Sequence, residues 1–364
     1  MSGNRINRYI RPRRMVFRLP PWRLVDFNAY RFAKIMMPLL TIGIPVYKRL
    51  DCLHLALQSV AAQDYPYIEL IVSDNGQNGT RVREIIEEWY PKPYVFRQNE
   101  ATVPLPSHHT QLVHAASGRY FAWMPDDDTI SPTYASDLVK VLDNRPDVSV
   151  AIARQEVVDA TGHLMRRSPD HLPDYSRGED FIRNWTANGF DSYTSIVART
   201  EDIRRCGGYL DCPWGNYSDN ALMVKLCLSG AVAYRKTCAY RLRQDPASFG
   251  WSISIGRFAE DTARFLTFLG SDPVVLSYAS RAPEQWRELK DVLLTMTWQA
   301  YFHRWNLMGR QSPPFFPWIK AGFALPYVPC YYRAVGTTLR WAIRKRIMLG
   351  VKRCLRKINN EIAP

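Results

Sequence analysis

Apolar and polar positions alternate along residues 39–124 in blocks that predict strands and helices in turn. The run Leu39–Ile44 is almost continuously apolar, as expected for a strand buried on both faces of a parallel sheet. Pro45 is expected to end this strand, and Asp51 stands where an N-cap would open an amphipathic helix. This opening pattern predicts the first strand–helix step of an α/β fold.

The same rhythm continues towards the middle of the chain. We expect strands at Ile68–Ser73, Tyr94–Arg97 and Tyr120–Met124, and helices at Arg81–Trp89 and Ser107–Ala116. Further on, where the rhythm loosens, we expect strands at Val148–Ala153, Tyr193–Ala198 and Ala231–Tyr240, a helix at Ala221–Leu228, and helical structure from about Trp251. The pattern predicts a Rossmann-like α/β fold, with a mostly parallel sheet flanked by helices.

The composition fits a globular protein of 364 residues, 46% of them hydrophobic. No apolar stretch reaches the 18 residues or so that a spanning helix needs, and the N-terminus lacks the pattern of a secretory signal. Seven cysteines are scattered without metal-binding spacing, which is typical of reduced thiols in a cytoplasmic protein.

The net charge of +14 is concentrated at the two ends of the chain. Residues 1–38 contain nine Lys or Arg and one acid, and residues 292–364 contain twelve and one, whereas the middle carries a small excess of acids. This segregation indicates an anionic partner that the ends alone would meet.

Polar clusters follow three of the predicted strands, at Pro45–Tyr47, Asp74–Gly76 and Asp126–Asp128. In open α/β sheets, ligands bind at the carboxyl ends of the strands. Each cluster alone also fits a helix cap or a solvated turn. Three consecutive acids beside a buried strand favour a divalent cation, since carboxylates and substrate phosphates are the ligands of Mg²⁺ and Mn²⁺.

Six ordered segments then resemble the landmarks of family 2 glycosyltransferases of the bacterial surface-polysaccharide type. They are Thr41–Tyr47 (TIGIPVY), Ser59–Tyr65 (SVAAQDY), Glu69–Gly76 (ELIVSDNG), Ala116–Asp128 (ASGRYFAWMPDDD), Gly207–Asp211 (GGYLD) and Ser218–Asp219. The resemblance implies a GT-A fold over residues 39–250, divided into a nucleotide-sugar half (39–130) and an acceptor half (131–250). A basic N-terminal extension (1–38) and a helical, basic-aromatic region (251–364) flank it.

The resemblance also implies roles for the matching residues. Those assigned to the nucleotide are Pro45 and Tyr47, which line its pocket, Asp74, which bonds the base, and Asp126 and Asp127 of the DxD-like motif, the first near the ribose. Asp128 is the best metal ligand, with Asp126 as a second, and the cofactor is Mn²⁺ or Mg²⁺. Asp219 matches the general base, although its position also suits capping of the next helix.

Two departures from the family pattern leave alternatives open. A His that often follows the last strand is missing, so either Asp245 acts as the third metal ligand or Arg241 and Arg243 bind phosphate directly. The usual Arg-Asn pair before the acidic strand is replaced by His109 and Thr110. His108 and His109 are candidates to face the donor, but adjacent helix residues rarely share a face, so at least one is expected to be structural.

The basic C-terminus contains one apolar stripe flanked by cations. Its members are Leu339, Ile343, Ile347, Val351, Leu355 and Ile358. This composition is typical of a helix lying on anionic lipid, and the alternative is a packed terminal helix with a solvated basic face. A nucleic-acid-binding protein would also have basic ends, but no recognition module is present. A non-catalytic scaffold is the third alternative, and the intact acids argue against it.

These observations predict an inverting hexosyl- or deoxyhexosyltransferase with a metal cofactor and an Asp base. The donor is a nucleotide-diphosphate sugar, and the acceptor is a glycan or a polyprenyl-linked glycan in polysaccharide biosynthesis. The expected location is cytoplasmic, peripheral on the inner face of the plasma membrane, and no nucleic acid is expected as a partner.

Overall fold

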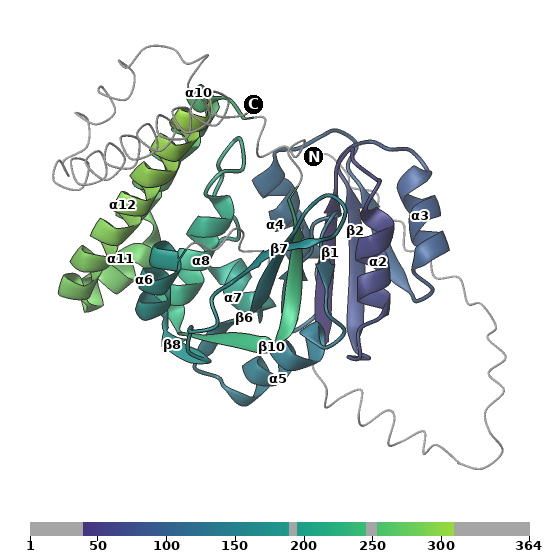
Figure 1. Cartoon of the computed structure of the whole chain (residues 1–364), viewed down its shortest axis with the longest axis horizontal. Helices are drawn as coiled ribbons and strands as arrows, with labels where there is room; N and C mark the ends of the chain where they lie inside the picture. Colours follow the sequence, from purple (N-terminus) through teal and green to yellow (C-terminus); the bar gives the residue numbers. More distant parts are fainter. Residues whose placement is uncertain (1–38, 189–194, 245–252, 309–364) are drawn as a thin grey trace, which may run out of the picture.

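The computed structural model describes residues 39–188, 195–244 and 253–308 (Figure 1). The strands are β1 (Leu40–Val46), β2 (Ile68–Asp74), β3 (Tyr94–Gln98), β4 (Tyr120–Trp123), β5 (Thr129–Ile130), β6 (Val148–Val158), β7 (Leu164–Arg167), β8 (Tyr175–Arg177), β9 (Ile196–Arg199) and β10 (Ala231–Arg243). The helices are α2 (Leu53–Ala61), α3 (Arg81–Trp89), α4 (Leu105–Ala115), α5 (Tyr134–Asn144), α6 (Gly178–Asn188), α7 (Thr200–Arg205), α8 (Ser218–Ser229), α10 (Ile255–Ser271), α11 (Pro273–Arg281) and α12 (Pro283–Met308). No helix within these ranges is both long and apolar enough to span a bilayer.

The described strands form one mixed sheet in the order β3-β2-β1-β4-β9-β6-β10-β5, with β7 beside β6 and β8 beside β10. Strands β1 to β4 are parallel where they pair, and so are β6 and β10. Strand β9 runs antiparallel between β4 and β6, so β6 regains the direction of β4. The carboxyl ends of β1, β4, β6 and β10 therefore lie along one edge of the sheet, and the predicted mostly parallel α/β fold is confirmed.

Side chains on opposite faces of the sheet build two hydrophobic cores, as the period of two in a strand requires. On β4, Phe121 and Trp123 pack into the core under α4, α6, α8 and α10–α12, whereas Tyr120 and Ala122 pack into the core under α2, α3 and α5. Figure 1 shows the two helical layers on either side of the sheet. A strand buried on both faces explains why its sequence is continuously apolar.

The region after residue 252 is helical where the structure describes it. Residues of α10, α11 and α12, among them Phe265, Val275 and Leu289, are buried in the same core as Trp123 of β4. The basic-aromatic stretch that was expected to meet a membrane falls within residues 309–364, outside the described residues, and the N-terminal extension 1–38 also lies outside them.

Two local predictions are wrong. Strand β1 continues through Pro45 to Val46. The β1–β4 ladder ends at Gly43, two residues earlier, so the missing N–H of Pro45 points beyond the end of β4 and no ladder bond is lost. The N-cap of α2 is Cys52 rather than Asp51, because the backbone carbonyl of Cys52 accepts the first helical bonds, from Leu55 and Ala56.

Candidate functional site

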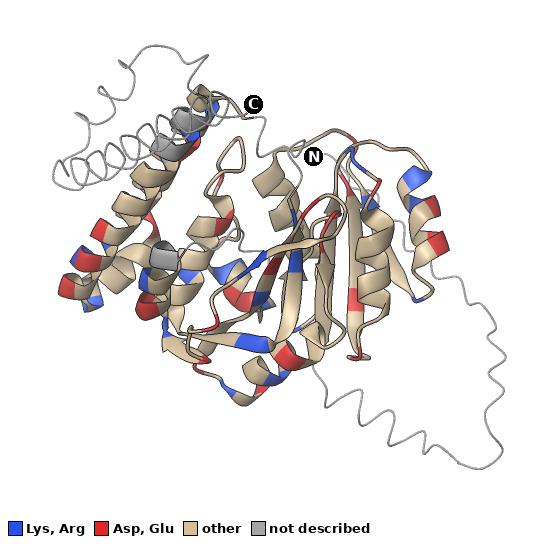
Figure 2. Cartoon of the chain, in the orientation of Figure 1, with Lys and Arg blue, Asp and Glu red and all other residues tan. Residues whose placement is uncertain are grey.

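The end of β1 and the acidic turn after β4 meet at the carboxyl edge of the sheet. The Met124 N–H donates to the Gly43 carbonyl at 3.0 Å, which keeps the two chains paired up to the turn. Beyond it, the backbone of Tyr47 lies near the Asp126 carboxylate and lowers the pKa of that group. Tyr47 itself is 44% exposed. Figure 2 shows charged segments of both signs on the strands and loops around this edge. The end of β1 and the acidic turn thus lie side by side.

Asp126 lies half-buried beside two other acids. Burial, and to a smaller extent the charge of Asp127, raise its pKa to about 7, although the Arg49 guanidinium opposes both effects. A carboxylate whose charge is this costly is stabilised by an added cation. A cation bound beside Asp126 would therefore stabilise its charged form.

Asp127 is joined to protein cations. Its carboxylate forms an ion pair with Arg49, which follows β1. Its carbonyl accepts from Nε of Arg243 at 3.2 Å, and Nη1 of the same guanidinium donates to the carbonyls of Asp159 and Ala160. Arg243 thereby ties the acidic turn to the loop between β6 and β7.

Asp128 is buried and attached to β10. Its Oδ2 accepts from the Tyr240 hydroxyl at 2.6 Å, and its Oδ1 accepts from the backbone N–H of Arg243 at 2.8 Å. Burial raises the pKa of Asp128 well above its usual value, and the neighbouring Asp127 adds to the rise. Both of its carboxylate oxygens thus already have donors within the protein.

The acidic turn fits a metal site that the phosphates of the substrate complete better than a site built from protein side chains alone. Within residues 39–188, 195–244 and 253–308, no group of three or more His, Cys, Asp or Glu side chains lies close enough to hold a metal ion. Mg²⁺ commonly binds through one or two carboxylates and the phosphates of its substrate. Asp126 and Asp128 suit that arrangement. The predicted third ligand, Asp245, lies outside the described residues.

Asp74 is fully buried and organises the turn after β2. Its carboxylate accepts from the N–H of Gly76 and Asn78 at 2.8 Å each, from the Asn78 side chain at 2.8 Å and from Gln98 at 3.0 Å. The Asn78 side chain also donates to the Tyr47 carbonyl. The turn that Asp74 holds therefore packs directly on the exposed end of β1.

Gly76 is required in this turn for a steric reason. A Cβ atom at this position would lie 1.8 Å from the Tyr47 carbonyl oxygen, so only glycine lets the two loops approach. Asn75 fixes the other side, since its Oδ1 accepts from the N–H of Val103 at 2.9 Å and from Asn99 at 2.8 Å. Sequence reasoning treated these residues as turn formers and missed their role in joining three loops.

His108 and His109 are both buried in α4. Nε2 of His108 lies 2.9 Å from the Ser73 hydroxyl, and Nδ1–H of His109 donates to the Leu105 carbonyl at 2.9 Å. Burial lowers the pKa of His108 to about 3 and that of His109 to about 4, so both imidazoles are neutral. These contacts are structural for both residues.

Asp219 lies in the first turn of α8, half-buried, and its Oδ1 accepts from the N–H of Asn220 at 2.9 Å. Its charge adds to the effect of burial in raising the pKa of Tyr209. The Tyr209 ring packs edge-on against Trp123, with centroids 4.9 Å apart. Because Trp123 lies at the end of β4, this aromatic contact connects the surroundings of Asp219 with the strand that leads to the acidic turn.

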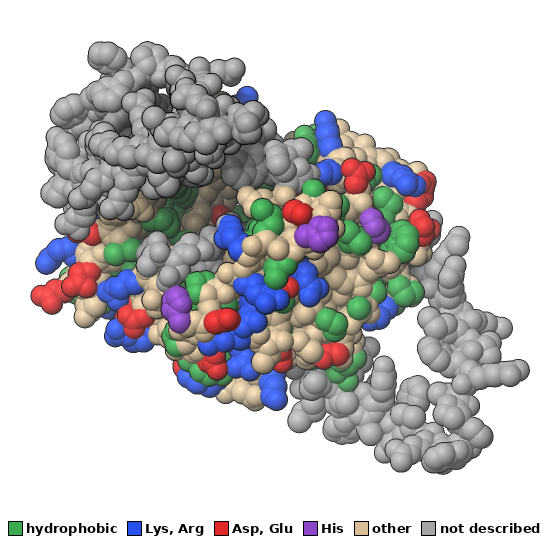
Figure 3. All heavy atoms as spheres, viewed as in Figure 1, with side chains coloured by type: hydrophobic (Ala, Val, Ile, Leu, Met, Phe, Trp, Pro, Cys, Tyr) green, Lys and Arg blue, Asp and Glu red, His purple; other side chains and the backbone are tan. Residues whose placement is uncertain are grey.

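Arginines of β7 and β10 surround Glu156 of β6. The Glu156 carboxylate accepts from Nε of Arg167 and Nε of Arg241, each at 3.0 Å. Figure 3 shows basic side chains gathered over this part of the molecule. Arg241 keeps about half of its side chain exposed (46%), so of the two arginines predicted as phosphate ligands it has the more accessible guanidinium, while Arg243 bonds several carbonyls.

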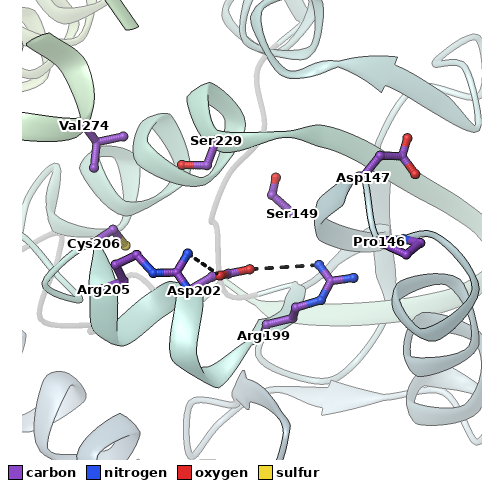
Figure 4. Close-up of a pocket in the computed structure, with 9 residues that line it drawn as sticks. All are labelled: Pro146, Asp147, Ser149, Arg199, Asp202, Arg205, Cys206, Ser229 and Val274. Carbon is purple, nitrogen blue, oxygen red and sulfur yellow. Dashed lines mark ion pairs between the residues drawn. The ribbon is translucent and has the colours of Figure 1, made fainter. Parts of the chain in front are cut away.

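A cavity of about 140 Å³ lies at the opposite edge of the sheet (Figure 4). Its lining includes residues at the start of β6 and at the end of β9, among them Asp147 and Arg199. The guanidinium groups of Arg199 and Arg205 both point to Asp202, at 4.0 and 3.0 Å. Both arginines thus already pair with Asp202, and none of the predicted site residues lines this cavity.

Comparison with known proteins agrees with the family resemblance of the segments that end at the carboxyl edge of the sheet. Residues 41–204 match the family model described as glycosyl transferase family 2. An uncharacterized glycosyltransferase of Rickettsia conorii is 27% identical over 133 residues, which is 35% of this chain and 21% of the relative. One from Rickettsia prowazekii is 25% identical over 132 residues, or 36% and 41% of the two chains. The chain thus spans well under half the length of these curated relatives.

Solved structures are similar in fold. The crystal structure of S. aureus TarS 1-349 in complex with UDP-GlcNAc has a TM-score of 0.52 and 13% identity, covering 73% of this chain and 83% of that one. The crystal structure of S. aureus TarS has a TM-score of 0.51 and 15% identity, covering 83% and 49%. At these identities the similarity concerns the fold alone.

Proposed function

Because this chain belongs to glycosyltransferase family 2 and has a GT-A fold, we propose that it transfers a sugar from a nucleotide-diphosphate donor to a glycan or polyprenyl-linked acceptor, with inversion. The observation that carries this proposal is the contact between the end of β1 and the acidic turn, made by the Met124 N–H with the Gly43 carbonyl and by the Arg49–Asp127 ion pair. It supports a donor site at the carboxyl edge of the sheet, where open α/β sheets bind ligands.

The donor occupies this edge in our proposal. Pro45 and Tyr47 line the nucleotide pocket, and the turn that Asp74 holds forms its wall. Asp74 is fully buried with both oxygens bonded inside this turn, so it shapes the wall and does not bond the base as the resemblance implied. Asp126 and Asp127 lie towards the ribose and diphosphate. Arg241 offers an exposed guanidinium for the phosphates. That TarS was crystallised with UDP-GlcNAc makes this nucleotide sugar a sensible first probe.

We propose that Asp126 and Asp128 hold Mn²⁺ or Mg²⁺, with Asp245 as a third ligand. When bound, the metal supplies positive charge to the diphosphate leaving group. Asp219 accepts the proton of the acceptor hydroxyl while that oxygen attacks the anomeric carbon from the face opposite the diphosphate. This displacement inverts the configuration of the sugar, and the nucleoside diphosphate leaves.

A screen of nucleotide sugars tests the function. We expect the full chain to hydrolyse or transfer at least one nucleotide sugar from a panel that includes UDP-GlcNAc, and to require manganese or magnesium. Mass spectrometry of the released nucleotide, with and without the metal and with EDTA as control, makes the measurement. No turnover of any donor, with or without an acceptor glycan, would favour a non-catalytic scaffold.

We further propose that the basic ends hold the protein on the inner face of the plasma membrane. Each Lys or Arg near an anionic surface contributes about 1 kcal/mol, so the excess of twelve basic residues over one acid in residues 292–364 supports reversible docking.

Removing residues 334–364 is expected to abolish co-sedimentation with vesicles that contain anionic lipid, because the amphipathic stripe and its cations are lost together. Vesicles of neutral lipid serve as the control for charge. An unchanged fraction bound to anionic vesicles would contradict the proposal, and salt-sensitive binding to RNA in place of vesicles would favour the nucleic-acid alternative.

A further inference from the structure

The loop that leads into α8 has an unusual backbone. Two of its residues have positive φ, Gly215 at +82° and Tyr217 at +63°. Glycine adopts this conformation readily, but tyrosine does so only where the surroundings hold it there. Tyr217 is the N-cap of α8, and only Ser218 separates it from Asp219. The direction of the Asp219 side chain therefore depends on how this turn is held.

Asp261 of α10 holds the turn through three hydrogen bonds. Its Oδ2 accepts from the backbone N–H of Asn216 at 2.9 Å and from the Asn216 side chain at 2.8 Å, and its Oδ1 accepts from the N–H of Trp214 at 3.2 Å. Asp261 is fully buried between Phe258 and Phe265 on the apolar face of its helix. A carboxylate in such a place is costly unless it is bonded, and the loop supplies all three of these donors.

Other residues of α10 bind the same loop. The Arg257 guanidinium lies over the Trp214 ring, 3.9 Å from its centroid. The indole N–H of Trp214 donates to Glu260 at 3.0 Å. The loop is thus fastened to one helix at successive turns, with Asp261 as the buried member.

The left-handed residue is clamped as well. The Tyr217 ring stacks on Phe265, with centroids 5.0 Å apart and an interplanar angle of 19°. Its hydroxyl donates to the Thr297 carbonyl of α12 at 3.3 Å. The C-terminal helices therefore fix both the backbone and the side chain of the residue that starts α8.

We propose that Asp261 is a positioning residue of the transferase, which fixes the turn at residues 214–217 and thereby aims Asp219 at the acceptor hydroxyl. This inference rests on the proposed role of Asp219 as the general base. In this proposal α10 covers the hydrophobic core and also positions the general base through the loop before α8. The proposal also explains a buried carboxylate where helix packing alone would favour an apolar side chain.

Asp261→Asn tests the proposal with little change of volume. An amide has one acceptor oxygen, so at least one loop donor loses its partner. We expect the amides of Trp214 and Asn216 to exchange with deuterium about tenfold faster or more in the full chain, since a lost buried hydrogen bond shifts local opening by about that factor. The turnover number should fall about tenfold, with the KM for UDP-GlcNAc, or for the donor that the screen identifies, within about twofold of wild type.

Asp272→Asn is the matched control. Asp272 also accepts two backbone N–H groups, from Val274 at 2.9 Å and Val275 at 3.3 Å, but it caps α11 and serves no part of the loop. We expect it to leave loop exchange and turnover unchanged. Asn216→Ala is the milder second variant, because it removes only the side-chain bond to Asp261. Its effect on turnover should be non-additive with that of Asp261→Asn, as for residues in contact.

The outcomes separate this inference from the proposed function. If the wild type turns over no donor, the function fails, whereas loop exchange still decides whether Asp261 holds the turn. If the wild type is active and Asp261→Asn exchanges faster but keeps its turnover number, the positioning role is wrong and the function stands. Unchanged loop exchange in Asp261→Asn would also overturn the positioning role of Asp261. So would additive effects on turnover when Asp261→Asn and Asn216→Ala are combined.

Discussion

Replacing Asp219 by Asn is expected to lower the turnover number for sugar transfer by about 10²–10⁴-fold, the range that removal of a general base usually costs. The amide cannot take the acceptor proton, but it keeps the size of the carboxylate and its place in the first turn of α8. Donor binding should persist, because the donor contacts proposed here come from the ends of β1 and β4. Turnover measured by mass spectrometry and donor affinity measured by calorimetry make the comparison.

Asp137→Asn is the control that separates catalysis from helix capping. Asp137 also stands in the first turn of a helix, α5, and accepts from the Thr237 hydroxyl at 2.7 Å. Either substitution removes a negative charge near a helix N-terminus, which is worth about 0.3–1 kcal/mol of stability. We expect similar shifts in unfolding for the two variants and a loss of turnover for Asp219→Asn alone. Near-normal turnover in Asp219→Asn would show that the residue only stabilises its helix.

The parts of the fold that the sequence predicted well are those determined by local patterns. Helix α3 has the predicted bounds, Arg81–Trp89, because its apolar positions have helical spacing and turns flank it. Strands β1 and β2 were recognisable because burial on both faces makes most of their residues apolar. Pro45 misled the prediction, since a proline stops a strand only where a neighbouring strand needs its N–H.

The candidate site was predictable in its composition and not in its internal contacts. The sequence does not distinguish the three acids at Asp126–Asp128. In the structure one lies half-buried near Tyr47, one pairs with Arg49 and one is buried against β10. These partners come from strands distant in the sequence, and only the sheet order brings them together. No periodicity in the chain encodes such an arrangement.

The C-terminal helices also make contacts that the sequence pattern did not predict. Their helical character was expected from about Trp251, but the contact of Asp261 with the loop before Asp219 spans more than 40 residues of sequence. In the sequence, Asp261 is one acid on a helix with both polar and apolar positions. Its function becomes visible only when burial and three loop donors are seen together.

Acidification is expected to destabilise the protein strongly, because two buried histidines stay neutral in the folded state. Folding lowers the pKa of His108 from 6.5 to about 3 and that of His109 from 6.5 to about 4. Below pH 6.5 both histidines therefore bind protons in the unfolded chain but stay unprotonated in the folded chain. The free energy of unfolding thus decreases as the pH falls. Between about pH 7.5 and about pH 5, each histidine should remove about 2 kcal/mol from the free energy of unfolding.

Urea unfolding of the wild type, His108→Gln and His109→Gln at these two pH values measures the effect. Each variant should lose less stability than the wild type on acidification, by about 2 kcal/mol. His163→Gln is the control, because it removes an imidazole that is 85% exposed on the β6–β7 connection. Its loss of stability on acidification should equal that of the wild type. Equal pH dependence in all four proteins would mean that the buried imidazoles become protonated inside the fold. That outcome would place positive charge next to the Ser73 hydroxyl and the Leu105 carbonyl, and it would contradict the neutral state of both imidazoles.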